Sequence, residues 1–117
     1  MLATAIPVSN TRFKIGWIIL LVSAALFTLA HLSLIFVFAN EQTLFIGHTA
    51  FTLLAFLIIL IPFREGKKWA WLATWILPVG LALTGAFDAE IAPYYIGMAV
   101  VCALGLLLTM RDFFPKR

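Results

Sequence analysis

Four long apolar runs separated by short polar segments make up most of the chain. The runs cover about 15–39, 44–63, 69–87 and 91–110. A hydrocarbon core of about 30 Å is crossed by roughly 20 apolar residues in a helix, so each run is long enough to span a membrane. Because the connections are short, consecutive helices should be antiparallel neighbours. The pattern predicts an all-α polytopic membrane protein: a single domain, 1–117, with four transmembrane helices in an up-down-up-down bundle.

Two prolines modify this pattern. Pro62 lies at the end of the second run, where proline is typical of a helix stop. Pro78 lies in the middle of the third run and has no backbone N–H to donate. We therefore expect a kink between Thr74 and Pro78, which a membrane helix tolerates when neighbouring groups satisfy the freed carbonyl.

The composition agrees with a membrane location. The chain is 64% hydrophobic and only 11% charged, whereas a soluble domain carries about 25% charged residues. So few charges cannot cover the surface of a soluble bundle, and this class is excluded. The single cysteine, Cys102, lies inside the fourth run, so no intrachain disulfide is possible.

The distribution of charge predicts the orientation of the helices. All eight basic residues fall in the N-terminal segment, the connection between the second and third runs, and the C-terminal segment. The two other connections contain Glu41, Asp88 and Glu90 and no basic residue. Lys and Arg are enriched in cytoplasmic loops, so both termini are expected in the cytoplasm. Membrane topology thus explains the net charge of +3, and no nucleic-acid partner is expected.

The beginning of the chain bears on the choice of membrane. No Arg- and Ser-rich transit segment precedes the first run, which favours the cytoplasmic (inner) membrane of a prokaryote. A signal peptide cleaved after Ala39 is an alternative that would remove His31 and leave three spans. However, the first run is far longer than the roughly 7–15 apolar residues of a signal peptide.

The connection between the second and third runs carries a resemblance. The segment 63–71, Phe-Arg-Glu-Gly-Lys-Lys-Trp-Ala-Trp, together with Pro78, resembles segments of small bacterial four-span proteins of unassigned function. This resemblance implies a bacterial membrane protein and brings no mechanism with it.

Two histidines within the apolar runs are the candidates for chemistry, since ionisable side chains inside a membrane are costly and commonly functional. At the helical rise, His31 should lie about 13 Å below the outer turn at 40–43, and His48 about 7 Å below it. A difference of about 6 Å in depth permits communication through a water or a tilted contact, but argues against a ready-made ligand pair.

Three interpretations of the histidines are open. In the first, each neutral imidazole pairs with a hydroxyl or carbonyl in the bundle, and Thr28 and Thr52 are placed for this on the same helix faces. In the second, an outward-facing cavity binds or transports a cation or small polar molecule. Its lining would be His31, His48, Thr52 and Thr84, with Glu41, Asp88, Glu90, Tyr94 and Tyr95 around its mouth.

In the third interpretation, His31 and His48 ligate haem or a divalent metal ion. A metal ion would need Asp88 or Glu90 as a further ligand. The difference in depth argues against two axial haem ligands on these helices.

No catalytic signature is present, so we do not expect an enzyme. Small residues at four-residue spacing, such as Ala82 with Ala86 and Ala99 with Ala103, suit close contacts between membrane helices. The sequence therefore favours a protein that acts by contact, as an accessory or assembly subunit of a membrane complex or as a homo-oligomer. Its expected partners are the lipid bilayer and other membrane subunits or itself. The outward-facing binding or transport site is the alternative, and a haem- or metal-binding protein is the third.

Overall fold

Helices account for nearly all of the chain that is described. The computed structural model describes residues 11–114, and within this part no strand is found. The helices are α1 (Thr11–Val37), α2 (Gln42–Ile58), α3 (Lys68–Thr74), α4 (Ile76–Phe87) and α5 (Ala92–Phe113). A 3-10 turn, η1 (Ala39–Glu41), precedes α2, and a π-helical turn, η2 (Ile59–Phe63), continues it.

The four predicted spans are confirmed as helices. Four helical segments are long and apolar enough to cross a membrane: Thr11–Val37, Gln42–Phe63, Lys68–Phe87 and Ala92–Phe113. Two of their ends, at 63 and 87, match the prediction and the others differ by one to four residues; the first helix begins and ends earlier than the apolar run suggested. The described part of the chain is thus an all-helical bundle with the predicted number of helices that are long and apolar enough to span a membrane.

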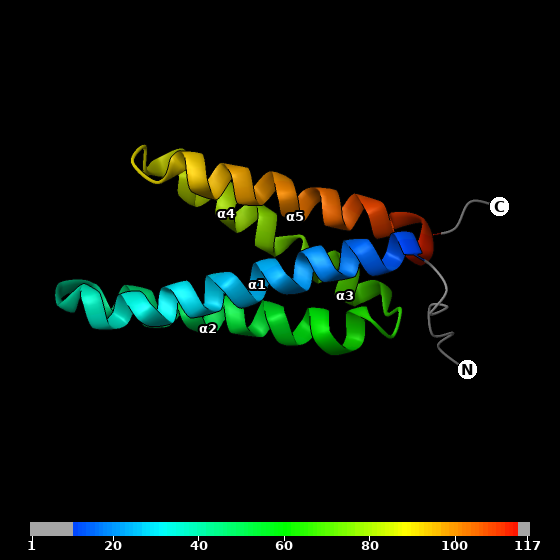
Figure 1. Ribbon diagram of the computed structural model, residues 1–117, viewed down its shortest axis with the longest axis horizontal. Helices are drawn as coiled ribbons and strands as arrows, with labels where there is room; N and C mark the ends of the chain where they lie inside the picture. The colour runs from blue at the N-terminus through cyan, green and yellow to red at the C-terminus, as the bar shows by residue number, and fades with distance from the viewer. Residues whose placement is uncertain (1–10, 115–117) are drawn as a thin grey trace.

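The helices form two antiparallel hairpins that meet along one side. α1 packs against α2, α4 packs against α5, and α1 also runs along α5. In Figure 1 the hairpins lie close together where α1 begins and α5 ends, and they diverge toward the opposite end. We call the first the closed end, around Phe13, Phe63 and Phe113, and the second the open end, around Glu41, Asp88 and Glu90.

Both prolines alter the helices that contain them. The third span divides at Trp75 into α3 and α4, as the position of Pro78 predicted. Pro62 lies within the π-helical turn η2, and the second span ends one residue later, at Phe63, as predicted. A turn follows in which Gly66 adopts a φ of 81°, a conformation that glycine reaches without strain.

Aromatic rings and close backbone contacts hold the closed end together. The ring of Phe63 lies 4.9 Å from that of Phe113 and 5.9 Å from that of Phe13, measured between centroids. Nearby, α1 crosses α5 at Gly16 and Gly105. A Cβ atom added to Gly16 would lie 2.7 Å from the carbonyl oxygen of Gly105, so only glycine permits this approach.

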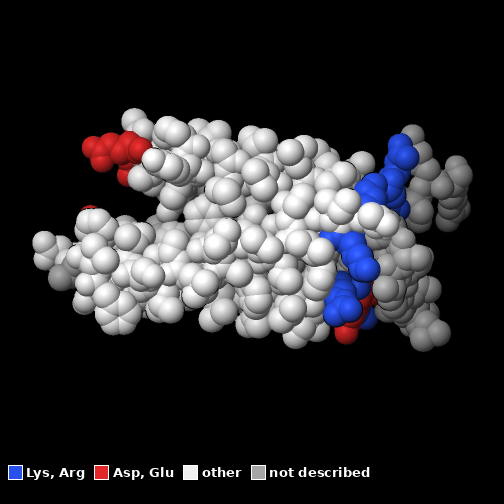
Figure 2. Space-filling view, viewed as in Figure 1, with Lys and Arg blue, Asp and Glu red and all other residues white. Residues whose placement is uncertain are grey.

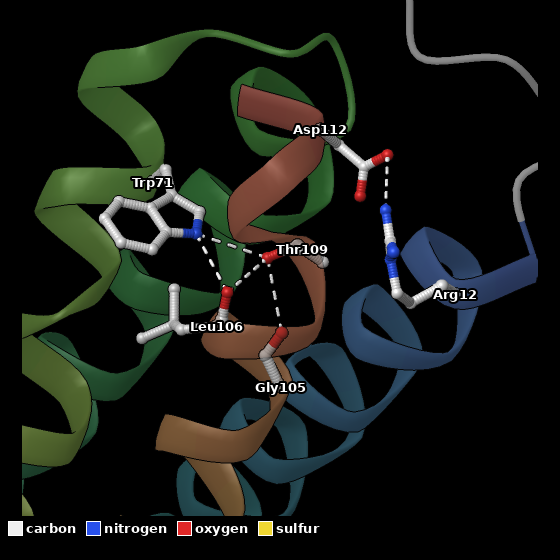
Figure 3. Close-up of polar contacts among 6 residues, drawn as sticks. All are labelled: Arg12, Trp71, Gly105, Leu106, Thr109 and Asp112. Carbon is white, nitrogen blue, oxygen red and sulfur yellow. Dashed lines mark hydrogen bonds and ion pairs between the residues drawn. The ribbon is translucent and has the colours of Figure 1, made fainter. Parts of the chain in front are cut away.

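Polar contacts at the closed end join three of the spans (Figure 3). The indole Nε1 of Trp71 in α3 donates to the carbonyl of Leu106 and to the hydroxyl of Thr109, at 3.1 and 3.2 Å, both in α5. Arg12 of α1 lies 3.8 Å from the carboxylate of Asp112. These contacts tie α1, α3 and α5 to one another.

Candidate functional site

His31 lies at the junction of the two hairpins. Its side chain is only 3% exposed, and its Nε2 atom lies 2.8 Å from the hydroxyl of Tyr95 in α5. The rings of Phe27 and Phe45 lie within 5.8 and 6.3 Å of the imidazole, measured between centroids. One nitrogen of this imidazole thus meets a hydroxyl of another helix, whereas its buried Nδ1 has no hydrogen-bond partner within residues 11–114.

His48 of α2 contacts His31 directly. The two imidazole centroids are 5.1 Å apart, and the rings meet edge to face. The predicted difference in depth is wrong because the helix ends were misplaced. His31 lies six residues before the end of α1 at Val37, and His48 lies six residues after the start of α2 at Gln42. Both thus lie about 9 Å from the open end of the first hairpin.

The His48 ring has hydrogen-bonding capacity that the protein does not use. The side chain is partly exposed, and within residues 11–114 nothing forms a hydrogen bond with the imidazole. Its Nδ1 atom is buried, so a ligand reaches the ring through Nε2. Nε2 is therefore the nitrogen of His48 that is left for a further partner.

The first interpretation, in which each imidazole pairs with a hydroxyl or carbonyl of the bundle, holds for His31 through Tyr95, but neither Thr28 nor Thr52 pairs with an imidazole. The hydroxyl of Thr52 donates to the backbone carbonyl of His48 at 3.0 Å, and that of Thr28 donates to the carbonyl of Ala24 at 2.7 Å. A threonine in a helix reaches the carbonyl four residues earlier without help from another side chain. The hydroxyl that His31 does contact, that of Tyr95, comes from a different span.

A cavity opens from this histidine pair toward the open end. A small space of about 90 Å³ is bordered by both histidines, Thr52, Thr84 and Tyr95. It continues into a cleft of about 800 Å³ that shares His48, Thr84 and Tyr95 with it. The cleft separates the two lobes at the acidic end of the molecule in Figure 2. We call these two spaces together the outer cavity.

The structure places most of the predicted site residues around the outer cavity. Glu41 and the α4–α5 connection, with Asp88 and Glu90, line the wide part of the cleft, and the histidines lie at its narrow end. Two predicted residues lie elsewhere. Tyr94 is 75% exposed and is not part of the lining, and Thr28 faces a separate groove beside Leu29 and Leu53.

The aromatic walls of the outer cavity were not predicted. Phe38, Phe45 and Phe87 line the cleft. Helical spacing offered a signal for one of these rings, because Phe45 precedes His48 by three residues and lies on the same helix face. The same signal applies to Phe27, which precedes His31 by four residues and packs on its ring.

The described side chains form neither a cluster of three metal ligands nor a haem site between the two histidines. Among the described residues no three His, Cys, Asp or Glu side chains come together as a metal site. The carboxylates of Asp88 and Glu90 line the wide cleft, not the narrow space that holds His31. The two imidazoles are in mutual contact, so a haem plane has no space between them.

Comparison with protein families, curated proteins and solved structures finds no match to this chain. The function is therefore argued from the outer cavity itself. Its rim carries carboxylates, its walls are largely aromatic and aliphatic, and its floor has the hydrogen-bonding groups of His48 and Tyr95. This arrangement suits a ligand that is positively charged or polar in one part and apolar in another.

Proposed function

We propose that the chain is a multi-pass protein of a cytoplasmic (inner) membrane, of bacterial type, that binds a small cation or polar molecule in the outer cavity. Both termini lie in the cytoplasm, and the outer cavity opens to the opposite side. Support comes from Figure 2, where the Lys and Arg side chains of the visible face gather at the closed end. Basic residues mark the cytoplasmic side of membrane proteins.

One observation carries this proposal: two contacting histidines and a tyrosine lie at the floor of an open cavity. Polar and ionisable side chains inside a membrane are costly and commonly mark a functional site. His31, which is 3% exposed, is held by Tyr95, and the ring of His48 remains unpaired beside the cavity. The pair is thus prepared for a ligand.

The charge at the rim favours a cation over an anion. Glu41, Asp88 and Glu90 border the cleft, and the lining of the cleft contains no Lys or Arg. Carboxylates around a low-dielectric cavity raise the local concentration of cations. An anion would meet three negative charges before it reached the histidines.

Ligand-induced stabilisation tests the proposal. Thermal unfolding of the purified chain in nanodiscs is measured with a panel of small inorganic and organic cations. A cation that binds and is present at 100 times its Kd should raise the free energy of unfolding by about 2.7 kcal/mol. A variant with Glu41, Asp88 and Glu90 changed to Gln should lose most of this effect. Glu65→Gln, at the other end of the molecule, is the matched control. No stabilisation by any cation, or equal stabilisation of both variants, would contradict the proposal.

The orientation has its own test. Asn40→Cys lies at the turn of the first hairpin and Lys67→Cys in the connection before α3. In intact cells a membrane-impermeant maleimide should label Asn40→Cys, while Lys67→Cys should react only after the membrane is opened. The reverse result would overturn the orientation.

Assembly with another membrane subunit is a second candidate, and one observation favours it. A groove of about 270 Å³ on the outer side of α4 and α5 is lined by Ala82, Ala99 and Ala103. Small residues allow close approach of another membrane helix. Ala103→Trp would fill this groove, so it should shift the mass measured in mild detergent toward the monomer. If the native chain and Ala103→Trp both have the mass of a monomer, this candidate is contradicted.

A further inference from the structure

We propose that the ligand of the outer cavity is an organic amine with an apolar body, bound as an ammonium whose N–H donates to His48. This inference rests on the proposed binding function and narrows it to one chemical class. It follows from three properties of the outer cavity: its walls, its oxygen ligands and its unpaired imidazole.

The walls match an apolar body. Phe38, Phe45 and Phe87 line the cleft together with Leu34 and Leu83. Ligand sites of about 300–1,000 Å³ accommodate drug-sized molecules, and the cleft of about 800 Å³ lies in this range. A bare inorganic ion would leave these aromatic and aliphatic surfaces without contact, whereas an amine with an aryl or alkyl body covers them.

The oxygen ligands are too dispersed for an inorganic cation. Ca²⁺ takes six to eight oxygen ligands, and Mg²⁺ demands near-octahedral geometry. In residues 11–114 no group of three carboxylate, imidazole or thiol side chains is close enough to hold a metal ion. An ammonium group needs fewer partners, and it is also attracted by the faces of aromatic rings.

The histidine and tyrosine at the floor supply acceptors for N–H groups. A neutral imidazole has one acceptor nitrogen, and for His48 only Nε2 is accessible to a ligand. The hydroxyl of Tyr95 is engaged with Nε2 of His31. A tyrosine oxygen has two acceptor positions, so at least one remains available whichever partner supplies the shared proton. An ammonium at the floor therefore meets two acceptors.

His31 has a different role from His48 in this arrangement. It is 3% exposed, is enclosed by Phe27 and Phe45, and holds the tyrosine hydroxyl at 2.8 Å. We assign it as a positioning residue that acts through Tyr95. The residue that distinguishes N–H donors from other cations is His48.

Three matched probes test the inference by calorimetric titration of the full chain in nanodiscs. Naphthylmethylamine carries an N–H donor and a charge, naphthylmethyl-trimethylammonium carries the charge alone, and naphthylmethanol carries neither charge nor ammonium. We expect the primary amine to bind about tenfold more tightly than either analogue, since hydrogen bonds to charged groups are the stronger ones. Sodium and magnesium chlorides serve as inorganic probes.

Substitutions at His48 separate the hydrogen bond from general packing. His48→Leu should weaken binding of the primary amine about tenfold and change binding of the trimethylammonium probe less than about twofold. His48→Gln keeps an acceptor and should retain part of the preference for the amine. If His48→Leu fails to fold, the probe series on the native chain and on Glu41→Gln, with Glu65→Gln as control, still decides the question.

The possible outcomes distinguish the two proposals. Equal affinity for the amine and the trimethylammonium probe, unaffected by His48→Leu, would overturn the assignment of an N–H donor. Equal affinity for naphthylmethanol would overturn the requirement for charge. Binding of an inorganic cation without binding of any amine would overturn this inference and leave the proposed function standing. Binding of no cation of either kind would overturn both.

Discussion

Polar side chains of the closed end have partners on other helices, whereas a polar side chain of the open end is unpaired among residues 11–114. At the closed end, the Trp71 indole has two acceptors in α5, and Arg12 pairs with Asp112. At the open end, the His48 ring is unpaired within the described part of the chain. Satisfied polar groups hold helices together, whereas an unsatisfied one is a position for a ligand. The comparison separates a tightly packed end from the end that carries the proposed site.

The aromatic residues show the same contrast. Phe63 at the closed end is fully buried against other rings, while Phe87 at the open end is 88% exposed and borders the cleft. Also at the closed end, the guanidinium of Arg64 lies 5.2 Å from the centroid of the Trp17 ring. The indole N–H of Trp17 donates to the carbonyl of Ile59 at 2.7 Å. The closed end is thus packed and cross-linked, and the open end is left accessible.

The largest expected difference concerns matched phenylalanine substitutions. Phe63→Ala should destabilise the chain by about 3 kcal/mol, because it leaves a cavity among packed rings. Phe87→Ala should change stability by less than about 0.5 kcal/mol, because its ring has few contacts to lose. Reversible unfolding in bicelles measures both. Similar losses for the two variants would remove the distinction between the ends.

The second largest difference between the two ends is expected in the rate at which an introduced cysteine reacts with a thiol reagent. The native Cys102 is fully buried, so it provides a silent background. Thr84→Cys lines the outer cavity, and Thr109→Cys lies at the closed end with no exposed surface. A water-soluble maleimide should label the first about 100-fold faster, since reaction at the second requires local opening. Equal rates would show that the closed end also admits water.

Two tryptophans of α3 offer a smaller effect. Trp71→Phe removes the indole N–H that donates to Leu106 and Thr109, and should cost about 1 kcal/mol. Trp69 is 55% exposed, and Trp69→Phe is the matched control with no expected loss. Unfolding titrations of both variants provide the measurement. An equal loss from Trp69→Phe would indicate that interfacial anchoring, not the hydrogen bonds, determines the cost.

The smallest effect is expected for two adjacent tyrosines. Tyr95→Phe removes the hydroxyl that joins α5 to His31, and such bonds between membrane helices contribute about 0.6 kcal/mol on average. Tyr94→Phe, at an exposed position, should leave stability unchanged. When the titrations are repeated with a bound amine, the loss of stability caused by Tyr95→Phe should increase, and that caused by Tyr94→Phe should not. A larger loss for Tyr94→Phe would contradict the placement of the outer cavity.

The sequence predicted the features that depend on local chemistry. Run length gave four membrane-spanning helices, because the bilayer thickness demands it. The missing N–H of Pro78 gave the break between α3 and α4. The histidines and the carboxylates of the outer cavity were also identifiable, since charged or ionisable residues are rare in this chain and stand out from it.

Only the tertiary structure decided which side chains face one another. Apolar residues surround each helix, because lipid demands no polar outer face, so the sequence does not mark the side that points inward. For this reason Thr28 could not be separated from Thr84, nor Tyr94 from Tyr95, although only one of each pair lines the outer cavity. The contact between the histidines also depended on where α1 and α2 end, which is set by packing and turn geometry. Sequence determined the spans and the reactive groups, and the rotation and ends of the helices determined the site.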